Sequence, residues 1–499
     1  MAFFIALLGA SFIAALADAT PSAAGEDPGS ATDTPLVYPA AKRGNVVDDY
    51  HGVKVADPYR WLEQLDSPET RAWVSNEARI TESYLEGLPS RLGLRQRLAT
   101  LLNYEKYGVP FHKAGRYFYS YNSGLQEQSV LCMTEGLSGP PRVVLDPNLL
   151  STNGSLAVVG YVVSEDAKRL AYGVSHGGSD WTDWRIRDLD IGRDLPDVLR
   201  WTKYYRPAFT ANGEAVVYSA FPAPRAGDEL RARDLNDAVY LHTLGTPSTA
   251  DKKIYARPDH PDWQFEPHLT PDGRWLVVAA GEGEVGDKGL ENLYLVDGLE
   301  TDLTVVPLIE GFGAAYEYAG YDDGLLYFQT TLDAPRGRVI AIDPKTPDRA
   351  HWKDLGREGP DSMDMAGVSV SVVNRQIIVR TMHDAHTKVS VYGEDGRGRG
   401  EVSLPGLGVA SGFNGEASDR NTFYVYADLA TAPTIFQLEL ASRTSTVFRA
   451  PKIDFDLNTL ETTQVFYTSK DGTRIPMYLV YKKGLKKDGN NPTLLYGYG

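Results

Sequence analysis

A serine flanked by glycines is the first residue of the sequence that could do chemistry. Residues 173–177 (GVSHG) satisfy the Gly-x-Ser-x-Gly pattern of hydrolases, in which the serine hydroxyl attacks a carbonyl carbon and forms an acyl-enzyme. That chemistry requires a sharp strand-to-helix turn that exposes the serine. Here the surrounding residues (RLAYGVSHGGSDWTDWRIRDL) read as two strands joined by a turn. The pattern therefore predicts that Ser175 is a strand residue and not a nucleophile.

Two other patterns are typical of cofactor or metal binding. Residues 281–286 (GEGEVG) match the dinucleotide fingerprint, which functions only where a helix N-terminus faces the pyrophosphate. Two carboxylates lie in this segment and a strand-like run (LENLYLVDG) follows, so we interpret it as a hairpin loop. His383 and His386 have the spacing of a metal pair, but no third ligand clusters convincingly beside them. We therefore expect no cofactor and no metal.

Length, charge and cysteine content limit the classes of protein. With 499 residues the chain should hold several domains, at roughly 100 to 200 residues per domain. The 66 acidic residues outnumber the 50 basic ones and give a net charge of −16, which argues against nucleic-acid binding. The single cysteine, Cys132, excludes an internal disulfide, a zinc ribbon and an iron–sulfur site.

The N-terminus has the pattern of an export signal. Residues 3–16 are an apolar run, and residues 17–19 (ADA) have the small-x-small pattern of a signal-peptidase site. A transmembrane anchor is the alternative, but the run is shorter than the roughly 20 apolar residues that span a bilayer. We expect cleavage after Ala19, a periplasmic or secreted protein without membrane contact, and a flexible spacer over residues 20–37.

Two helices are expected to follow the spacer. Ser67 can cap a helix, Pro68 suits its first position, and apolar stripes continue until Gly87. A second helix is expected from Ser90. Near Asn103 the hydrophobic period changes from about 3.6 to 2, which indicates a change from helices to sheet.

The rest of the chain contains a repeated unit. A small polar or glycine-containing turn leads into an aromatic or β-branched strand, and another strand follows. The seven instances begin at Gly115 (GRYFYSYNSG), Lys168 (KRLAYGVSHG), Gly213 (GEAVVYSAF), Gly273 (GRWLVVAAG), Asp323 (DGLLYFQTT), Asn374 (NRQIIVRTM) and Arg420 (RNTFYVYAD). Their spacing of roughly 50 residues fits four-stranded propeller blades. Two unrelated β-sandwiches with shared turn chemistry are the alternative.

A series of ordered motifs runs from residue 38 to the end of the sequence. The motifs are residues 49–52 (DYHG), 57–63 (DPYRWLE), 115–119 (GRYFY), 145–148 (LDPN), 179–181 (SDW), 469–473 (SKDGT), 475–477 (IPM) and 496–499 (YGYG). On these motifs the chain resembles the prolyl oligopeptidase family of serine peptidases. The resemblance implies a mainly β fold, in which a seven-bladed β-propeller is inserted into an α/β-hydrolase peptidase domain. It places the N-terminal helical segment of that domain at residues 38–103, the propeller at 104–451 and the start of the catalytic part at 452–499.

The catalytic triad implied by the resemblance is missing from this sequence. An α/β-hydrolase triad runs in the order Ser, Asp, His. Residues 452–499 contain no histidine, and their one serine, Ser469, lies in a charged turn. We expect that the hydrolase domain is truncated in this chain and that the chain is inactive alone.

Three site residues are carried over from the resemblance. Tyr498 of the YGYG motif corresponds to the tyrosine of the oxyanion hole. Asp180 resembles the propeller carboxylate that pairs with a substrate-site arginine, and Tyr204 matches an aromatic wall for a substrate residue upstream of proline. The chain departs from the family's apolar, arginine and cysteine pocket residues at Gln264, Gly281 and Glu284. The upstream substrate preference is therefore not carried over.

The resemblance implies cleavage of short proline-containing peptides after proline, by a protein that is a monomer at full length. Two alternatives stay open. One is the related oligopeptidase activity that cleaves after basic residues, and the other is a non-catalytic propeller that acts as a binding module.

Overall fold

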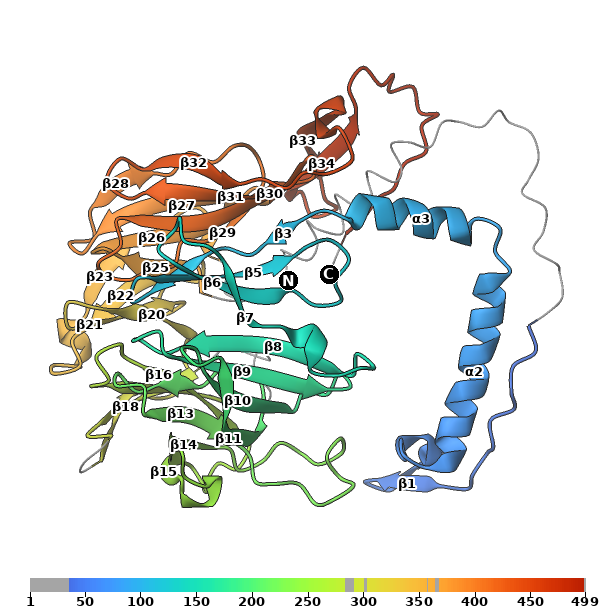
Figure 1. Cartoon of the computed structure of the whole chain (residues 1–499), viewed down its shortest axis with the longest axis horizontal. Coiled ribbons are helices and arrows are strands. Elements are labelled where there is room, and N and C mark those ends of the chain that lie inside the picture. The colour runs from blue at the N-terminus through green and yellow to red at the C-terminus, as the bar shows by residue number, and fades with distance from the viewer. Residues whose placement is uncertain (1–35, 283–290, 300–302, 357, 364–367, 498–499) are drawn as a thin grey trace. The chain divides into compact units, whose positions relative to one another are not determined.

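The computed structural model of the chain describes residues 36–282, 291–299, 303–356, 358–363 and 368–497 (Figure 1). This part of the chain forms two compact units, residues 36–102 and residues 103–497. The expected signal sequence, most of the spacer, Glu284 and Tyr498 lie outside the described residues. None of the helices in these ranges is both long and apolar enough to cross a lipid bilayer.

The smaller unit contains the two helices expected from the sequence. The Ser67 hydroxyl accepts a hydrogen bond from the Thr70 backbone N–H at 3.1 Å, Pro68 is the first helical residue and Gly87 ends the helix. The Trp61 and Trp73 rings meet edge to face at 6.4 Å. The elements are β1 (Val47–Tyr50), β2 (Val53–Ala56), η1 (Arg60–Glu63), α2 (Pro68–Glu86) and α3 (Arg91–Leu102).

The larger unit contains a seven-bladed β-propeller, which Figure 1 colours in chain order from β3 to β32. Each blade is an antiparallel sheet of four or five strands that follow one another in the chain. Blade one holds β3 (Lys106–Tyr107), β4 (Phe111–Lys113), β5 (Arg116–Asn122), β6 (Val130–Glu135) and β7 (Arg142–Leu145), and η2 (Pro147–Leu149) follows. Blade two holds β8 (Leu156–Val163), β9 (Arg169–His176), β10 (Thr182–Asp188) and β11 (Arg193–Thr202). Blade three holds β12 (Ala208–Phe209), β13 (Ala215–Ala220), β14 (Ala238–Thr243), η3 (Ser248–Ala250) and β15 (Lys252–Ala256).

The remaining blades have the same order. Blade four holds β16 (Trp263–Leu269), β17 (Leu276–Glu282), β18 (Glu291–Asp297) and β19 (Thr304–Ile309). Blade five holds β20 (Tyr316–Asp322), β21 (Leu325–Thr330), β22 (Arg338–Ile342), η4 (Arg349–His351) and β23 (Lys353–Gly356). Blade six holds β24 (Ser362–Met363), β25 (Val370–Val373), β26 (Gln376–His383), β27 (His386–Gly393) and β28 (Gly398–Glu401). Blade seven holds β29 (Val409–Gly412), β30 (Asn421–Asp428), β31 (Thr431–Glu439) and β32 (Thr444–Arg449).

The sequence repeat corresponds to one strand position in every blade. Each of its seven instances is the turn into the second strand together with that strand, namely β5, β9, β13, β17, β21, β26 and β30. The propeller prediction is therefore confirmed, and the sandwich alternative is wrong.

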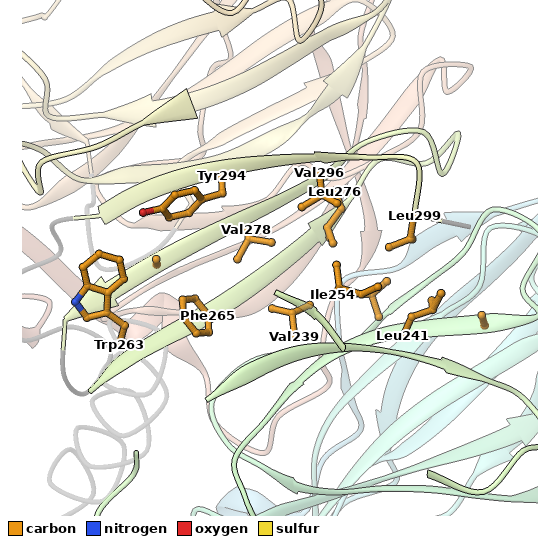
Figure 2. Close-up of a cluster of buried hydrophobic side chains, with 13 residues drawn as sticks. Val239, Leu241, Ile254, Trp263, Phe265, Leu276, Val278, Tyr294, Val296 and Leu299 are labelled. Atoms are coloured by element: carbon orange, nitrogen blue, oxygen red, sulfur yellow. The ribbon is translucent and has the colours of Figure 1, made fainter. Parts of the chain in front are cut away.

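Apolar side chains between neighbouring blades form the core. Figure 2 shows one such cluster, where Val239 and Leu241 of blade three face Phe265 and Val278 of blade four. All four side chains are at most 9% exposed. Full burial of such a side chain contributes about 1.5–3 kcal/mol, so each blade is stabilised chiefly by its neighbours.

The first and last blades meet through side chains, because no strand is exchanged between them. His112 Nε2 accepts a hydrogen bond from the Gly115 N–H at 2.9 Å, so the proton of the neutral ring lies on Nδ1. Nδ1 is 2.8 Å from the Asp419 carboxylate and 3.4 Å from that of Glu416, both in blade seven. In the described part of the chain these three residues are the one acidic and imidazole group compact enough for a metal ion. The close approach of the His112 ring to the two carboxylates links blade one to blade seven.

Residues after the propeller form one hairpin that contacts blade six. Its strands are β33 (Leu460–Thr468) and β34 (Arg474–Lys482), after η5 (Leu457–Thr459). The Gln464 side-chain amide donates to the Asp384 carbonyl at 2.6 Å, and the Tyr478 hydroxyl donates to the same oxygen at 3.3 Å. The turn between β26 and β27 is therefore the contact point of this hairpin.

Candidate functional site

Strand alternation brings several loops to one end of the propeller. Consecutive strands of a blade run in opposite directions, so the β9–β10 turn, the β11–β12 connection and the β13–β14 loop all lie at the same end. The chain also enters the propeller before β3 and leaves it after β32 at this end. Both predicted propeller site residues, Asp180 and Tyr204, lie in these loops.

Asp180 lies in the turn between β9 and β10. Its side chain is exposed, and its carbonyl accepts a hydrogen bond from the Thr182 hydroxyl at 3.5 Å. Within the described ranges its carboxylate forms no ion pair. An exposed, unpaired carboxylate is free to accept a guanidinium in bidentate geometry.

Trp181, the next residue, is the centre of an aromatic cluster. Its ring meets Trp201 at 5.6 Å and Phe221 at 6.0 Å, both edge to face. The Lys203 ammonium lies 4.1 Å from the centre of the Trp181 ring and binds both oxygens of Asp234 at 2.7 and 2.8 Å. The Lys203 and Asp234 side chains are 10% and 11% exposed. This ion pair therefore fixes the β13–β14 loop against Trp181.

Tyr204 follows Lys203 in the connection between blades two and three. Its φ of 58° lies in the left-handed region, which residues other than glycine seldom adopt. The ring is 45% exposed. Asp180 precedes Trp181 in the chain, and Tyr204 follows Lys203. The two predicted site residues therefore flank the contact between Trp181 and Lys203.

The residues with misleading motifs are structural. Ser175 is 3% exposed in β9, and its hydroxyl donates to the Ser179 carbonyl at 2.5 Å. Residues 276–282 and 291–297 are paired antiparallel strands, as the hairpin interpretation of the glycine motif requires. His383 and His386 face each other across the β26–β27 turn, with His383 Nδ1 2.6 Å from an Asp361 oxygen. The strand placement of Ser175 and the antiparallel strands on either side of the glycine motif are therefore confirmed, and residues 283–286 of that motif lie outside the described residues.

Sequence reasoning missed the Lys203–Asp234 ion pair. The two residues are 31 positions apart and belong to no motif. The aromatic residues around them give a weak signal, because Trp181, Trp201 and Phe221 all lie at strand ends that face one end of the propeller.

Breaking this ion pair should loosen the β13–β14 loop. We expect Lys203→Met to increase the rate of tryptic cleavage at Arg225, Arg231 or Arg233 by about tenfold, because a nearly buried Asp234 would lose its partner. The measurement is limited proteolysis followed by mass spectrometry. Lys253→Met is the matched control, since Lys253 contacts the Tyr240 ring and forms no ion pair within the described ranges. An unchanged cleavage rate in the Lys203 variant would contradict the anchoring role.

The fold and this loop cluster define a class of protein: a seven-bladed propeller that carries its candidate site at the end where the chain enters and leaves. A family model described as "Prolyl oligopeptidase, N-terminal beta-propeller domain" matches residues 38–451. The chain therefore belongs to the prolyl oligopeptidase family.

Known relatives cover nearly all of this chain. It is 35% identical to a prolyl endopeptidase of Elizabethkingia meningoseptica over 464 residues, which are 93% of this chain and 64% of that protein. A prolyl endopeptidase of Elizabethkingia miricola is 36% identical with the same coverage. The chain thus spans about 64% of the length of these curated relatives.

Solved structures agree with the fold. One from a structural study of two prolyl endopeptidases has a TM-score of 0.83 at 32% identity and covers 93% of this chain and 67% of its own. Prolyl oligopeptidase B from Galerina marginata, bound to a 25mer macrocyclization substrate, has a TM-score of 0.78 at 26% identity, with 91% and 66% covered.

Proposed function

We propose that this chain contributes the propeller to a serine endopeptidase that cleaves short peptides after proline. The observation that carries the proposal is the family match over residues 38–451 together with 35% identity to a prolyl endopeptidase over 93% of the chain. In this proposal the propeller admits small peptides to a hydrolase centre and excludes folded proteins by size. The loops around Asp180 and Tyr204 then face the substrate.

The chemistry of the proposal is acyl transfer. A serine attacks the carbonyl carbon after proline, a histidine takes and returns the proton, and a tyrosine hydroxyl donates to the oxyanion. Residues 452–499 contain one serine and no histidine, so they supply no triad. No step of this mechanism needs a metal or a cofactor.

Two rival functions predict other results. An oligopeptidase that cleaves after basic residues would prefer arginine over proline before the scissile bond. A non-catalytic binding propeller would bind peptides and cleave none. The protein is proposed to act as a monomer.

We further propose that the protein is exported. The apolar run over residues 3–16 and the ADA pattern at residues 17–19 support this proposal. Expression with a C-terminal tag in a bacterial host should place the tag in the periplasmic fraction and yield a protein that begins at Thr20. A cytoplasmic protein with an intact Met1 would contradict it.

The role of Asp180 provides a test of the proposed active-site geometry. In the protein made from the complete reading frame that contains these residues, we expect Asp180→Asn to lower kcat/KM for a succinyl-Gly-Pro amide reporter roughly tenfold, the scale of one charge-assisted hydrogen bond. Asp183→Asn is the matched control, because Asp183 lies on the same hairpin, 3.7 Å from the exposed His176. Equal kcat/KM values in both variants would assign Asp180 no part in the site.

A further inference from the structure

One row of blade four carries polar groups that the propeller does not use. Gln264 of β16 pairs with Gly281 of β17, and Gly281 pairs with Glu291 of β18. Residues paired in this way lie on the same face of a sheet, so Gln264 and Glu291 flank the glycine on one face. Among the described residues, no atom lies within 4 Å of the position that a Cβ at Gly281 would take. The row therefore has an open space at its centre.

The next row shows where this face points. Glu266 lies two residues after Gln264 and so belongs to the same face. Its partner Ala279, and Leu293 beyond, pack in the apolar cluster between blades four and five. The polar row thus continues this interface toward the end of the propeller that holds Tyr204, where the apolar packing stops.

Two side-chain oxygens of this face have no hydrogen-bond partner among the described residues. Gln264 is 1% exposed, and its Oε1 is buried with no hydrogen-bond donor among the described residues. The Oε2 oxygen of Glu291 is likewise buried and has no hydrogen-bond donor among the described residues. A buried acceptor without a donor is costly, so a site of this kind indicates a missing donor.

The charged groups of the neighbourhood are chiefly carboxylates, and His268 Nε2 lies 3.7 Å from a Glu266 oxygen. Burial and the nearby carboxylates of Glu317 and Glu266 raise the pKa of Glu291 to about 8, and burial and Glu266 raise the pKa of Glu317 to about 7. Burial, with the same three carboxylates, also raises the pKa of Tyr205. Glu291 and Glu317 form no ion pair within the described ranges. Both acids would be ionised more readily beside a cation.

The spacing of the carboxylates distinguishes an organic cation from a metal ion. A metal ion requires ligand atoms close to one another, and in the described part of the chain the His112 group alone has such atoms within 4.8 Å. The oxygens of Glu266, Glu291 and Glu317 are therefore spread more widely. A guanidinium or ammonium group donates in several directions and can also lie against the ring of Tyr205.

We propose that Gln264, Glu266, Glu291 and Glu317, here called the acidic site, bind a positively charged group of a peptide substrate. This inference rests on the proposed function, and it adds that a guanidinium or ammonium group on the peptide increases affinity. The side chain amide of Gln264 and the carboxylates accept hydrogen bonds from the cation, and the open space at Gly281 admits it. The basic side chain of arginine or lysine and the free amino terminus are the possible sources of the group.

The test measures binding of small cations by calorimetry with the 499-residue chain. The probes are the Nα-acetyl amides of arginine and lysine, glycinamide for the free amine, and the Nα-acetyl amide of citrulline as the neutral isostere of arginine. We expect at least one cation to bind more than tenfold tighter than citrulline, and to release protons near pH 7.5 because ionised carboxylates hold it. The probe that binds identifies the source of the charge.

Three variants place the binding at this site. Glu291→Gln and Glu317→Gln should each weaken cation binding roughly tenfold, and Gly281→Leu should weaken it by filling the space without a change in charge. Glu282→Gln is the matched control, because Glu282 adjoins Gly281 in β17 but lies on the opposite face. A cation affinity equal to that of citrulline, or an affinity that none of the three variants changes, would overturn the proposal.

A neutral peptide separates this inference from the proposed function. In the complete-reading-frame protein, turnover of a blocked Gly-Pro reporter tests the peptidase proposal without any cation. Turnover with no preference for a basic peptide would overturn the acidic site alone. Absence of all turnover, with cation binding retained, would overturn the peptidase proposal and leave the cation site as part of a binding propeller.

Discussion

Replacing His242 with leucine should lower the free energy of unfolding by about 3–5 kcal/mol, because two buried carboxylates would each lose the imidazole as a partner. His242 of blade three is 1% exposed. Its Nε2 lies 2.9 Å from Asp197 of blade two, and its Nδ1 lies 2.7 Å from Asp251 of blade three. The two carboxylate side chains are 1% and 2% exposed.

The geometry explains why the loss should be large. Both ring nitrogens face oxygens of buried carboxylates, so the imidazole lies between two acceptor groups. The Tyr218 hydroxyl and the Gly245 N–H also donate to these carboxylates, each at 2.6 Å. His242 therefore links buried carboxylates of two neighbouring blades through its two ring nitrogens.

Chemical denaturation followed by circular dichroism measures this effect. His176→Leu is the matched control, because the side chain of His176 is 55% exposed and 3.7 Å from its nearest carboxylate. That variant should change the free energy of unfolding by less than about 0.5 kcal/mol. Adding Asp197→Asn and Asp251→Asn to the His242 variant should recover much of the loss. A loss below about 1 kcal/mol for His242→Leu would contradict the role assigned to the cluster.

The second large effect concerns Tyr498, which lies outside the described residues. In the protein from the complete reading frame, Tyr498→Phe should lower kcat about 10²-fold with little change in KM, as expected when one oxyanion donor is lost. The donor acts on charge that develops only in the transition state, so substrate binding is spared. Steady-state kinetics on the succinyl-Gly-Pro amide reporter provide the measurement.

Tyr496 offers the control for this experiment. It precedes Tyr498 in the same motif and is 65% exposed. Tyr496→Phe should leave kcat within about twofold. If Tyr498→Phe raised KM and left kcat unchanged, the residue would contribute to substrate binding or packing and not to the oxyanion hole.

Much of the fold was predictable because its signals are local. Ser67, Pro68 and Gly87 mark a helix by their own backbone preferences, and the structure places the helix between them. The second strand of each blade follows a tight turn and is buried on both faces, so it has the strongest pattern in the blade. Ser175 could be assigned to a strand for the same reason.

The site was less predictable because its contacts depend on register and on neighbouring blades. Asp197, His242 and Asp251 come together across two blades, and no spacing in the sequence marks them. Gln264 and Glu291 share a face only because Gly281 pairs with both. A hydrophobic pattern predicts the strands but not their register. A shift of the strand pairing by one residue would move Gln264 or Glu291 to the other face of the sheet.

Cleavage specificity distinguishes a prolyl endopeptidase from its two rivals. The protein made from the complete reading frame that contains these 499 residues is assayed on two reporters that differ only in proline or arginine before the scissile amide bond. We expect cleavage after proline, loss of activity with a serine-directed inhibitor, and little cleavage after arginine. Cleavage after arginine alone, or binding of both reporters with no cleavage of either, would contradict this expectation.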